Sequence, residues 1–407
     1  MTQTEWGKPA LLGGQPIVEA PLPIVRPLLP PLAAIQERLD AAMQSGQLTN
    51  GGRHVQALEA QLAAYFAVAH VVAVNNATIG LLLLLRALAA DGEVILPSFT
   101  YAASAHAVVW AGLRPVFVDI LPDTYTLDPA AVARAITPRT AAIMGVHIYG
   151  HPCEIDDLQE VADHHGIPLI FDAAHAMGSR YRQQRVGGFG LAEVFSFHAT
   201  KIFPVGEGSV IATSDTQLAQ KLRLLRVFGS PPGEENTLLP GLNGKMQEFN
   251  ALIGLENLKN IDRYVTQRRA LVDQMRAEIA HLPGLHFQTQ RPHVYSNYQN
   301  LSLLVDAGAF GLSRDALFVA LRADNVHTRR YFHPPVHRHD AYAGSEHAHL
   351  PVTDRVADTV LCLPIYSQMQ AQEAHALCLT LRRLHAFAPA VRERLRAEGA
   401  AGSAGGC

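Results

Sequence analysis

Charged residues, cysteines and long apolar runs are all scarce in this sequence. Only 17% of the 407 residues are charged, and the formal net charge is -3, so no basic field for a nucleic acid exists and no nucleic-acid partner is expected. The most apolar run, residues 81–85, ends at Arg86 and is far shorter than the roughly 20 residues that span a bilayer. The first residues include Glu5 and Lys8 and lack the apolar region of a signal peptide. These features predict a cytoplasmic protein with no membrane partner.

The cysteines are too few and too scattered for a disulfide framework. They form no CxxC pair and stand at Cys153, Cys362, Cys378 and Cys407. Free thiols in a reducing compartment are therefore expected. A tail of Ala, Gly and Ser begins near Gly399 and is typical of disorder.

What the sequence does contain is a large apolar fraction in an alternating pattern. Hydrophobic residues make up 48% of the chain, enough to bury a sizeable core. Short strand-like runs alternate with amphipathic helical stretches, at residues 71–74, 94–96, 115–118, 141–146, 168–171, 194–197 and 210–212. This pattern predicts an α/β core with a mostly parallel, seven-stranded sheet between layers of helices.

The segments around this core predict further parts. Residues 31–45 and 54–66 are expected to be helices of an N-terminal arm, and residues 248–279 one long helix. Beyond residue 283, short strands and helices alternate, which predicts a compact α+β domain. The predicted organisation is an N-terminal arm at 1–68, a large domain at 69–247, a linking helix at 248–282, a small C-terminal domain at 283–390 and a disordered tail at 391–407.

Two residues of the core suggest a chemistry. Asp172 ends an apolar strand, and Lys201 follows a second strand. A pyridoxal phosphate (PLP) enzyme needs an amine that holds the cofactor as a Schiff base and a carboxylate that keeps the pyridine nitrogen protonated. A lone Lys or Asp is more often a solvated surface residue, so the surrounding sequence must decide between these interpretations.

The surrounding sequence resembles a known family. Residues 171–176 (FDAAHA), 195–201 (FSFHATK) and 206–213 (GEGSVIAT) resemble, in this order, the motifs of the DegT/DnrJ/EryC1/StrS family of PLP-dependent sugar aminotransferases. The resemblance implies PLP fold type I, with Lys201 as the Schiff-base and catalytic residue and Asp172 as the partner of the ring nitrogen. Sugar dehydratases of this family have histidine in place of the lysine, so Lys201 favours an aminotransferase.

The resemblance also implies a phosphate site. Ala77 and Thr78 match the family's phosphate-binding turn, although the family usually has glycine where Ala77 stands. Ser196 matches a serine whose hydroxyl binds the phosphate. A strand-to-helix junction suits an anion because its backbone N–H groups are free. Without the resemblance, a plain helix cap would be the better interpretation of this turn.

Three further residues are implied to contact the cofactor ring. Tyr101 matches an aromatic residue that stacks on the ring and sandwiches it against the residue at Ala174, and His175 matches a residue near the phenolic oxygen. From the residues alone, Tyr101 would be a core tyrosine and His175 a structural histidine.

A loop before the predicted long helix implies a homodimer. Asn243 matches a family asparagine that reaches the phosphate of the neighbouring subunit, which would make each active site composite. Lys245 stands where the family commonly has arginine. A turn built on Asn243 and Gly244 is the structural alternative.

The C-terminal half contributes a candidate substrate site. The resemblance implies that the loop carrying Arg329, Arg330, Tyr331 and His333 contacts the substrate, and two arginines beside an aromatic ring suit a diphosphate and a sugar or base. The histidines here are separated by prolines, and no cysteine or well-placed carboxylate completes a site, so no metal is predicted.

The resemblance implies transfer of an amino group from glutamate to a keto group, with C4 favoured, of a nucleotide-linked deoxyhexose, a dTDP- or UDP-4-keto-6-deoxyhexose. Pyridoxamine phosphate would be the intermediate cofactor form. Amination of a cyclitol or another ring ketone in antibiotic biosynthesis is an alternative. A non-catalytic regulatory or binding protein with a PLP fold is an alternative of another class.

Overall fold

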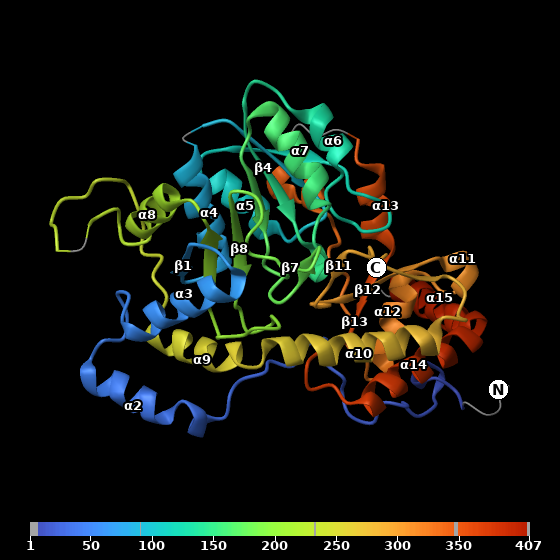
Figure 1. Cartoon of the computed structure of the whole chain (residues 1–407). Coiled ribbons are helices and arrows are strands. Elements are labelled where there is room, and N and C mark those ends of the chain that lie inside the picture. Colours follow the sequence, from blue (N-terminus) through green and yellow to red (C-terminus); the bar gives the residue numbers. More distant parts are fainter. Residues whose placement is uncertain (1–6, 90, 232, 346–348, 405–407) are drawn as a thin grey trace.

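A seven-stranded sheet forms the centre of the large domain (Figure 1). The computed structural model describes residues 7–89, 91–231, 233–345 and 349–404, with side chains through residue 397. The strand order is β1-β9-β8-β5-β4-β2-β3, and β9 is antiparallel to both of its neighbours while the other pairs are parallel. The strands are β1 (His70–Val74), β2 (Glu93–Pro97), β3 (Arg114–Val118), β4 (Thr140–Val146), β5 (Leu169–Asp172), β8 (Ala192–Ser196) and β9 (Ser209–Thr213). The predicted mostly parallel sheet is confirmed.

Helices cover both faces of this sheet because its strands are apolar on both sides. In β1, Val72 and Val74 face one core cluster, whereas Val71 and Ala73 face another. The first face is covered by α4 (Ala77–Leu88), α5 (Ala102–Trp110) and α8 (Thr216–Leu225). The second face is covered by α3 (Arg53–Phe66), α6 (Pro129–Ala135), α7 (Ile155–His165) and α9 (Glu248–Leu258). Outside these layers, α2 (Gln36–Ser45) projects from the N-terminal arm (Figure 1).

The predicted single helix over residues 248–279 is two helices. Helix α9 ends at Leu258, and α10 (Ile261–Ile279) begins after Asn260, whose φ of -122° lies outside the helical range. Asparagine disfavours helix interiors because its side chain competes for backbone hydrogen bonds, which explains a break at this position. Helix α10 then crosses from the large domain to the small one (Figure 1).

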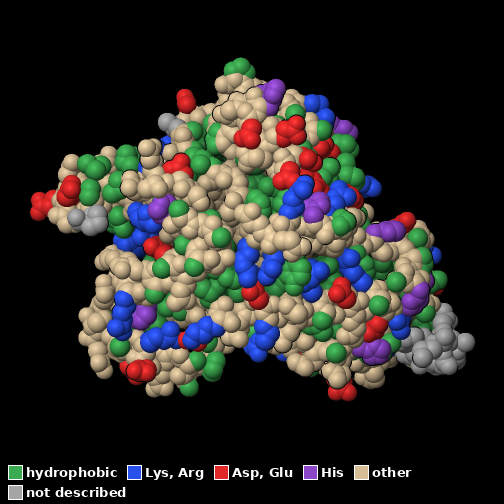
Figure 2. Space-filling model, viewed as in Figure 1, with side chains coloured by type: hydrophobic (Ala, Val, Ile, Leu, Met, Phe, Trp, Pro, Cys, Tyr) green, Lys and Arg blue, Asp and Glu red, His purple; other side chains and the backbone are tan. Residues whose placement is uncertain are grey.

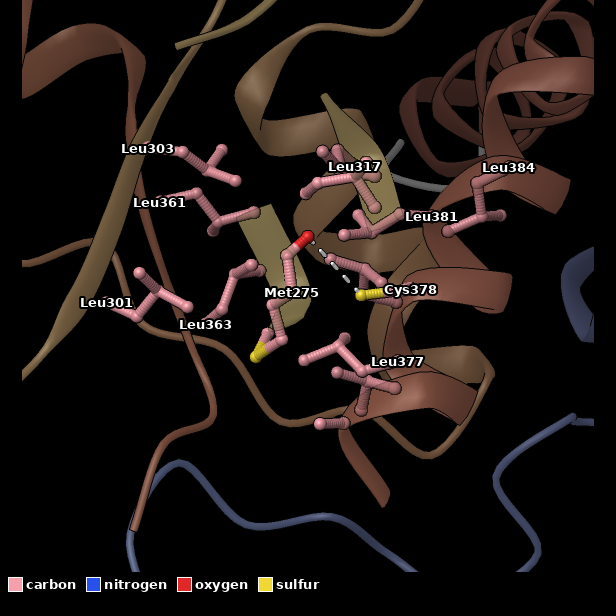
Figure 3. Packing of buried hydrophobic residues seen from close by; sticks show 14 of the residues in the cluster. Met275, Leu301, Leu303, Leu317, Leu361, Leu363, Leu377, Cys378, Leu381 and Leu384 are labelled. Carbon is pink, nitrogen blue, oxygen red and sulfur yellow. Dashed lines mark hydrogen bonds between the residues drawn. The ribbon is translucent and has the colours of Figure 1, made fainter. Parts of the chain in front are cut away.

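The small domain has its own apolar core. Its sheet has the order β10-β12-β13, from β10 (Leu285–Phe287), β12 (Leu301–Val305) and β13 (Val360–Leu363). Its helices are α11 (Ala307–Phe310), α12 (Arg314–Ala323), α13 (Pro351–Thr359), α14 (Ala371–Ala386) and α15 (Ala388–Ala404). Leucines from the sheet, from α12 and from α14 converge on Met275 of α10, whose carbonyl oxygen lies 3.9 Å from Cys378 Sγ (Figure 3). A further small sheet of β6 (Arg180–Tyr181), β7 (Gln184–Arg185) and β11 (Val294–Tyr295) joins the two domains.

Both termini differ from the expectations drawn from sequence. Residues 9–28, which we call the strap, pack on the small domain, with Val18 and Leu22 inside its core, rather than forming one arm with the following helices. At the other end, α15 is helical through Ala404, so most of the expected disordered tail is helix, and residues 405–407 lie outside the described part. Alanine, glutamate and arginine in this stretch are good helix formers.

The surface visible in Figure 2 mixes charges of both signs. Blue and red side chains are interspersed over this face, including along α10. Among the described helices, none is long and apolar enough to cross a bilayer.

Candidate active site

A cavity of about 620 Å³ opens at the carboxyl ends of the sheet strands, where α/β proteins bind ligands. Nine of the residues predicted from sequence line it: Ala77, Thr78, Tyr101, Asp172, Ala174, His175, Ser196, Lys201 and Tyr331. These residues are separated by up to 254 positions in the chain, yet the fold brings them around one space.

Lys201 presents a free amine to this cavity. Its backbone N–H donates to the carbonyl of His198 (2.9 Å), which fixes a tight turn just after β8. Within the described part of the chain, its Nζ makes no hydrogen bond or ion pair. Burial lowers the pKa of Lys201 to about 8, and the charge of Asp172 opposes this by raising it. The amine is therefore more often neutral, and more nucleophilic, than an ordinary lysine.

Asp172 is buried at the end of β5 and is held by two donors. Its Oδ1 accepts from the Ala174 N–H (3.0 Å), and its Oδ2 accepts from the Ser104 hydroxyl (2.7 Å). Ser104 Oγ in turn lies 2.9 Å from Thr100 Oγ1. This network orients the carboxylate and leaves it acceptor capacity, since an ionised carboxylate has about four acceptor sites.

His175 lies beside these groups as a neutral ring. Burial, and after it the positive charge of Lys201, holds the pKa of His175 well below its usual range. Its Nδ1 accepts from the Tyr149 N–H (3.2 Å). The single ring proton is therefore on Nε2, where it can be donated to a ligand oxygen.

The first turn of α4 supplies an anion site. Asn76 caps this helix through a hydrogen bond from the Ile79 N–H to its Oδ1 (2.9 Å), and the earlier N–H groups of Ala77 and Thr78 face the cavity end of the helix. The positive end of the helix dipole and the free N–H groups favour a phosphate here. Ser196 Oγ, which also lines the cavity, adds a hydroxyl.

Aromatic residues form another part of the cavity lining. Tyr101 is 65% exposed, and its ring centroid lies 6.2 Å from that of Phe332. The Phe332 ring is stacked on those of Tyr331 and His175, at centroid distances of 5.3 and 6.2 Å. A planar ligand is suited to contact with such faces.

Four of the predicted residues do not line the cavity. Asn243 is exposed in the loop before α9. Arg329 is exposed, and its backbone pairs with that of Cys362. The other two are directed elsewhere: Arg330 forms an ion pair with Asp315 (2.9 Å), and His333 Nδ1 lies 3.3 Å from Asp358 Oδ1. Of residues 329–333, Tyr331 and Phe332 line the cavity, and contact of this loop with a substrate stays a prediction. The side chains of Arg330 and His333 have acidic partners instead, Asp315 and Asp358.

Several lining residues were missed from sequence. Gln299, just before β12, holds the lysine loop from both sides: its Oε1 accepts from the Ile202 N–H (2.8 Å), and its Nε2 donates to the Thr200 carbonyl (3.0 Å). Ile24 and Val25 of the strap reach the cavity as well. No local motif marks these residues, because long-range packing brings them here.

The donor set fits PLP. A partly desolvated amine, an oriented carboxylate, a neutral imidazole N–H and a helix N-terminus match the aldehyde, ring nitrogen, phenolic oxygen and phosphate of this cofactor. Among the described residues, no group of His, Cys, Asp and Glu side chains could hold a metal ion.

Comparisons with known proteins agree with this geometry. The model of the DegT/DnrJ/EryC1/StrS aminotransferase family matches residues 32–382. The chain is 36% identical to the dTDP-4-amino-4,6-dideoxy-D-glucose transaminase of Escherichia coli, over 86% of this chain and 95% of that protein. It is also 36% identical to the dTDP-3-amino-3,4,6-trideoxy-alpha-D-glucose transaminase of Streptomyces venezuelae, over 79% and 85%. Its structure is similar to that of DesI in the presence of its TDP-sugar product, with a TM-score of 0.90, 41% identity and coverage of 95% and 98%.

Proposed function

The chain belongs to the DegT/DnrJ/EryC1/StrS aminotransferase family, and we propose that it moves an amino group from glutamate to C4 of a dTDP-linked 4-keto-6-deoxyhexose. It is a PLP-dependent transaminase of fold type I, and its relatives are transaminases of nucleotide-linked sugars. The observation that carries the proposal is the free Lys201 amine facing the same cavity as the oriented Asp172 carboxylate. The name of the Escherichia coli relative supports a dTDP-sugar and carbon 4, and the TDP-sugar product of DesI supports the same kind of nucleotide.

We assign the following roles to residues of this chain. PLP, when bound, supplies an electron sink that makes the α-hydrogen of an amino acid acidic. Lys201 Nζ would hold the cofactor and would act as the base that removes the proton from the α-carbon of glutamate. Asp172 keeps a proton on the ring nitrogen, and its own hydrogen bonds from Ser104 and Ala174 keep it oriented. His175 donates its Nε2 proton to the phenolic oxygen.

Residues at the other end of the cavity bind rather than react. The N–H groups of Ala77 and Thr78, with the hydroxyls of Thr78 and Ser196, hold the phosphate. Tyr101 covers one face of the ring, and Ala174 leaves room at the other. In the second half-reaction Lys201 Nζ would act as the acid that gives a proton to C4 of the sugar.

The experiment follows nitrogen from donor to product. Purified protein, PLP, 15N-labelled glutamate and dTDP-4-keto-6-deoxyglucose should yield a dTDP-sugar whose mass includes one 15N, with the label at C4 by NMR. Lys201→Ala should give no product and no cofactor band. Label at C3, which the Streptomyces venezuelae relative makes a defined alternative, would overturn the assignment of C4. Absence of any aminated sugar would overturn the substrate class.

We also propose a homodimer in which Asn243 completes the partner's site. The loop is held close to β1, since the Asn75 N–H donates to the Gly244 carbonyl (2.8 Å), yet the Asn243 side chain faces solvent. The connection between α8 and α9, which projects from the large domain (Figure 1), also carries Phe228 and Leu238, each 54% exposed and so accessible to a partner subunit.

A mixture of two inactive variants tests this arrangement. Hybrids of Lys201→Ala and Asn243→Ala chains regain one native site only if Asn243 acts in the partner, so random mixing should restore about a quarter of wild-type activity. No restoration, or a monomer by sedimentation, would exclude the composite site.

A cytoplasmic location follows from the proposed substrate, because a charged nucleoside diphosphate does not cross a bilayer unaided.

We propose that the chain divides into two domains and a connecting segment. A large domain lies at 69–247 and a small domain at 283–390, joined by 248–282, and the small-domain core, to which the strap is added, supports this division. Val336, Tyr342 and Leu350 nevertheless pack in the core of the large domain.

A further inference from the structure

The strap is fixed to the small domain on its way to the cavity. Leu22 is 2% exposed in the small-domain core and pairs in parallel with Val326. Its N–H donates to the Asn325 carbonyl (2.8 Å), and its carbonyl accepts from the His327 N–H (3.0 Å). The strap is thus held at this point by two strand-type hydrogen bonds.

Immediately afterwards the strap passes the cavity and is fixed again. Ile24 and Val25 line the cavity, and the Ile24 carbonyl accepts from the Ile365 N–H (3.4 Å). The next residue, Arg26, turns outward, with its guanidinium 4.9 Å from the centroid of the Tyr366 ring. With anchors on both sides, the two aliphatic side chains have a defined position.

These two side chains line the cavity, where Ile24 belongs to an apolar wall and Val25 lies next to it in the chain. Ile24 packs against the cluster that also includes Tyr331 and Phe332 at its edge. Between residues 21 and 28 the strap has no side-chain hydroxyl, amide or carboxylate, and its one charged residue, Arg26, points away. The groups assigned above to PLP come from the large domain, so the wall is not used by the cofactor chemistry.

We propose that Ile24 and Val25 are specificity-determining residues that receive the methyl group of a 6-deoxy sugar and disfavour sugars with a 6-hydroxyl. The inference rests on the proposed function. A methyl group gains contact with this wall, whereas a hydroxyl would lose its hydrogen bonds to water and find no partner there. An apolar pocket rejects an added hydroxyl by at most about 100-fold, so the selectivity should lie between about 10- and 100-fold.

The reverse half-reaction measures this selectivity. The PLP form of the dimeric protein is mixed with dTDP-4-amino-4,6-dideoxyglucose or with the matching dTDP-4-amino-4-deoxyglucose, and loss of the cofactor band gives kcat/KM for each. The wild type should prefer the 6-deoxy sugar by about 10- to 100-fold. Ile24→Thr and the nearly isosteric Val25→Thr place a hydroxyl in the wall and should each reduce this ratio by about fivefold or more.

Two controls separate a specific from a structural role. The rate of the half-reaction with glutamate should stay within about twofold in both threonine variants, because glutamate carries no sugar. Arg26→Gln loosens the strap without changing the wall and should leave the ratio unchanged. Equal wild-type rates with both sugars, or an equal change of ratio in Arg26→Gln, would overturn the inference while leaving the proposed function intact. Reaction with glutamate but with neither sugar would overturn the proposed function itself, and this inference with it.

Discussion

The lowered pKa of Lys201 predicts how fast the cofactor-free protein recaptures PLP at different pH values. Only the neutral amine attacks an aldehyde. With a pKa of about 8, the Lys201 amine is neutral in about one molecule in ten at pH 7, whereas an amine of pKa 10.5 is neutral in about one in three thousand. The structure therefore predicts attachment about 300-fold faster at pH 7 than for an ordinary lysine, provided the intrinsic nucleophilicity is similar.

The assay follows the absorbance band of lysine-bound PLP after PLP is added to the cofactor-free protein, between about pH 6 and pH 11. The apparent rate should rise with pH and level off above about 8, because the titrating group loses its proton there. Borohydride reduction and peptide mapping should locate the attachment at Lys201. A rate that keeps rising to pH 10 would refute the reasoning, since it would show an amine that burial does not perturb.

A variant checks the physical cause. The charge of Asp172 raises the pKa of Lys201, opposing the effect of burial. Asp172→Asn removes that charge and should move the midpoint to lower pH. A midpoint that moves upward would show that Asp172 is not the charge that the Lys201 ammonium senses.

Three further changes have defined outcomes. Ser104→Ala removes the hydroxyl that donates to Asp172, so the half-reaction with glutamate should slow about 5- to 10-fold in a stopped-flow assay while the cofactor stays bound. An unchanged rate would show that this hydrogen bond is not needed. Asp324→Ala leaves the buried Arg383 without its carboxylate partner and should lower the free energy of unfolding, measured by urea denaturation, by about 3–5 kcal/mol. A loss of less than about 1 kcal/mol would contradict a strong buried ion pair. Leu317→Ala, in the core of Figure 3, should cost about 3 kcal/mol, whereas Val319→Ala on the exposed side of the same helix should cost less than about 0.5 kcal/mol; similar losses would contradict the packing described.

The large domain could be predicted from sequence because its signals are local. Each strand is a short apolar run between turn residues, and all seven expected strands are present within about two residues of their predicted ends. The break at Asn260 was not predicted, because the apolar spacing continues across it. The strap was assigned to the N-terminal arm and not to the small domain, because Leu22 pairs with Val326, which is about 300 positions away in sequence.

In the candidate site, too, residues marked by local sequence were predicted correctly, whereas long-range contacts were not. Residues at or just after the carboxyl ends of strands, such as Asp172, Ala174 and Ser196, were predicted and do line the cavity, because these ends of parallel strands meet at one edge of the sheet. Arg330 was expected at the site from the resemblance of its loop, but it forms an ion pair with Asp315, a partner that the sequence alone does not reveal.

The position of Gln299 connects the two domains energetically. Its side chain holds both the Thr200 carbonyl and the Ile202 N–H, so the turn that carries Lys201 depends on contacts from the small domain. A ligand that binds only the folded site stabilises everything on which the site depends, by RT ln(1 + [L]/Kd). Cofactor bound in the large domain should therefore also oppose unfolding of the small domain and of the strap packed on it. Lys201 and the apolar wall at Ile24 thus both depend on the packing of the small domain, although they lie about 180 residues apart in the sequence.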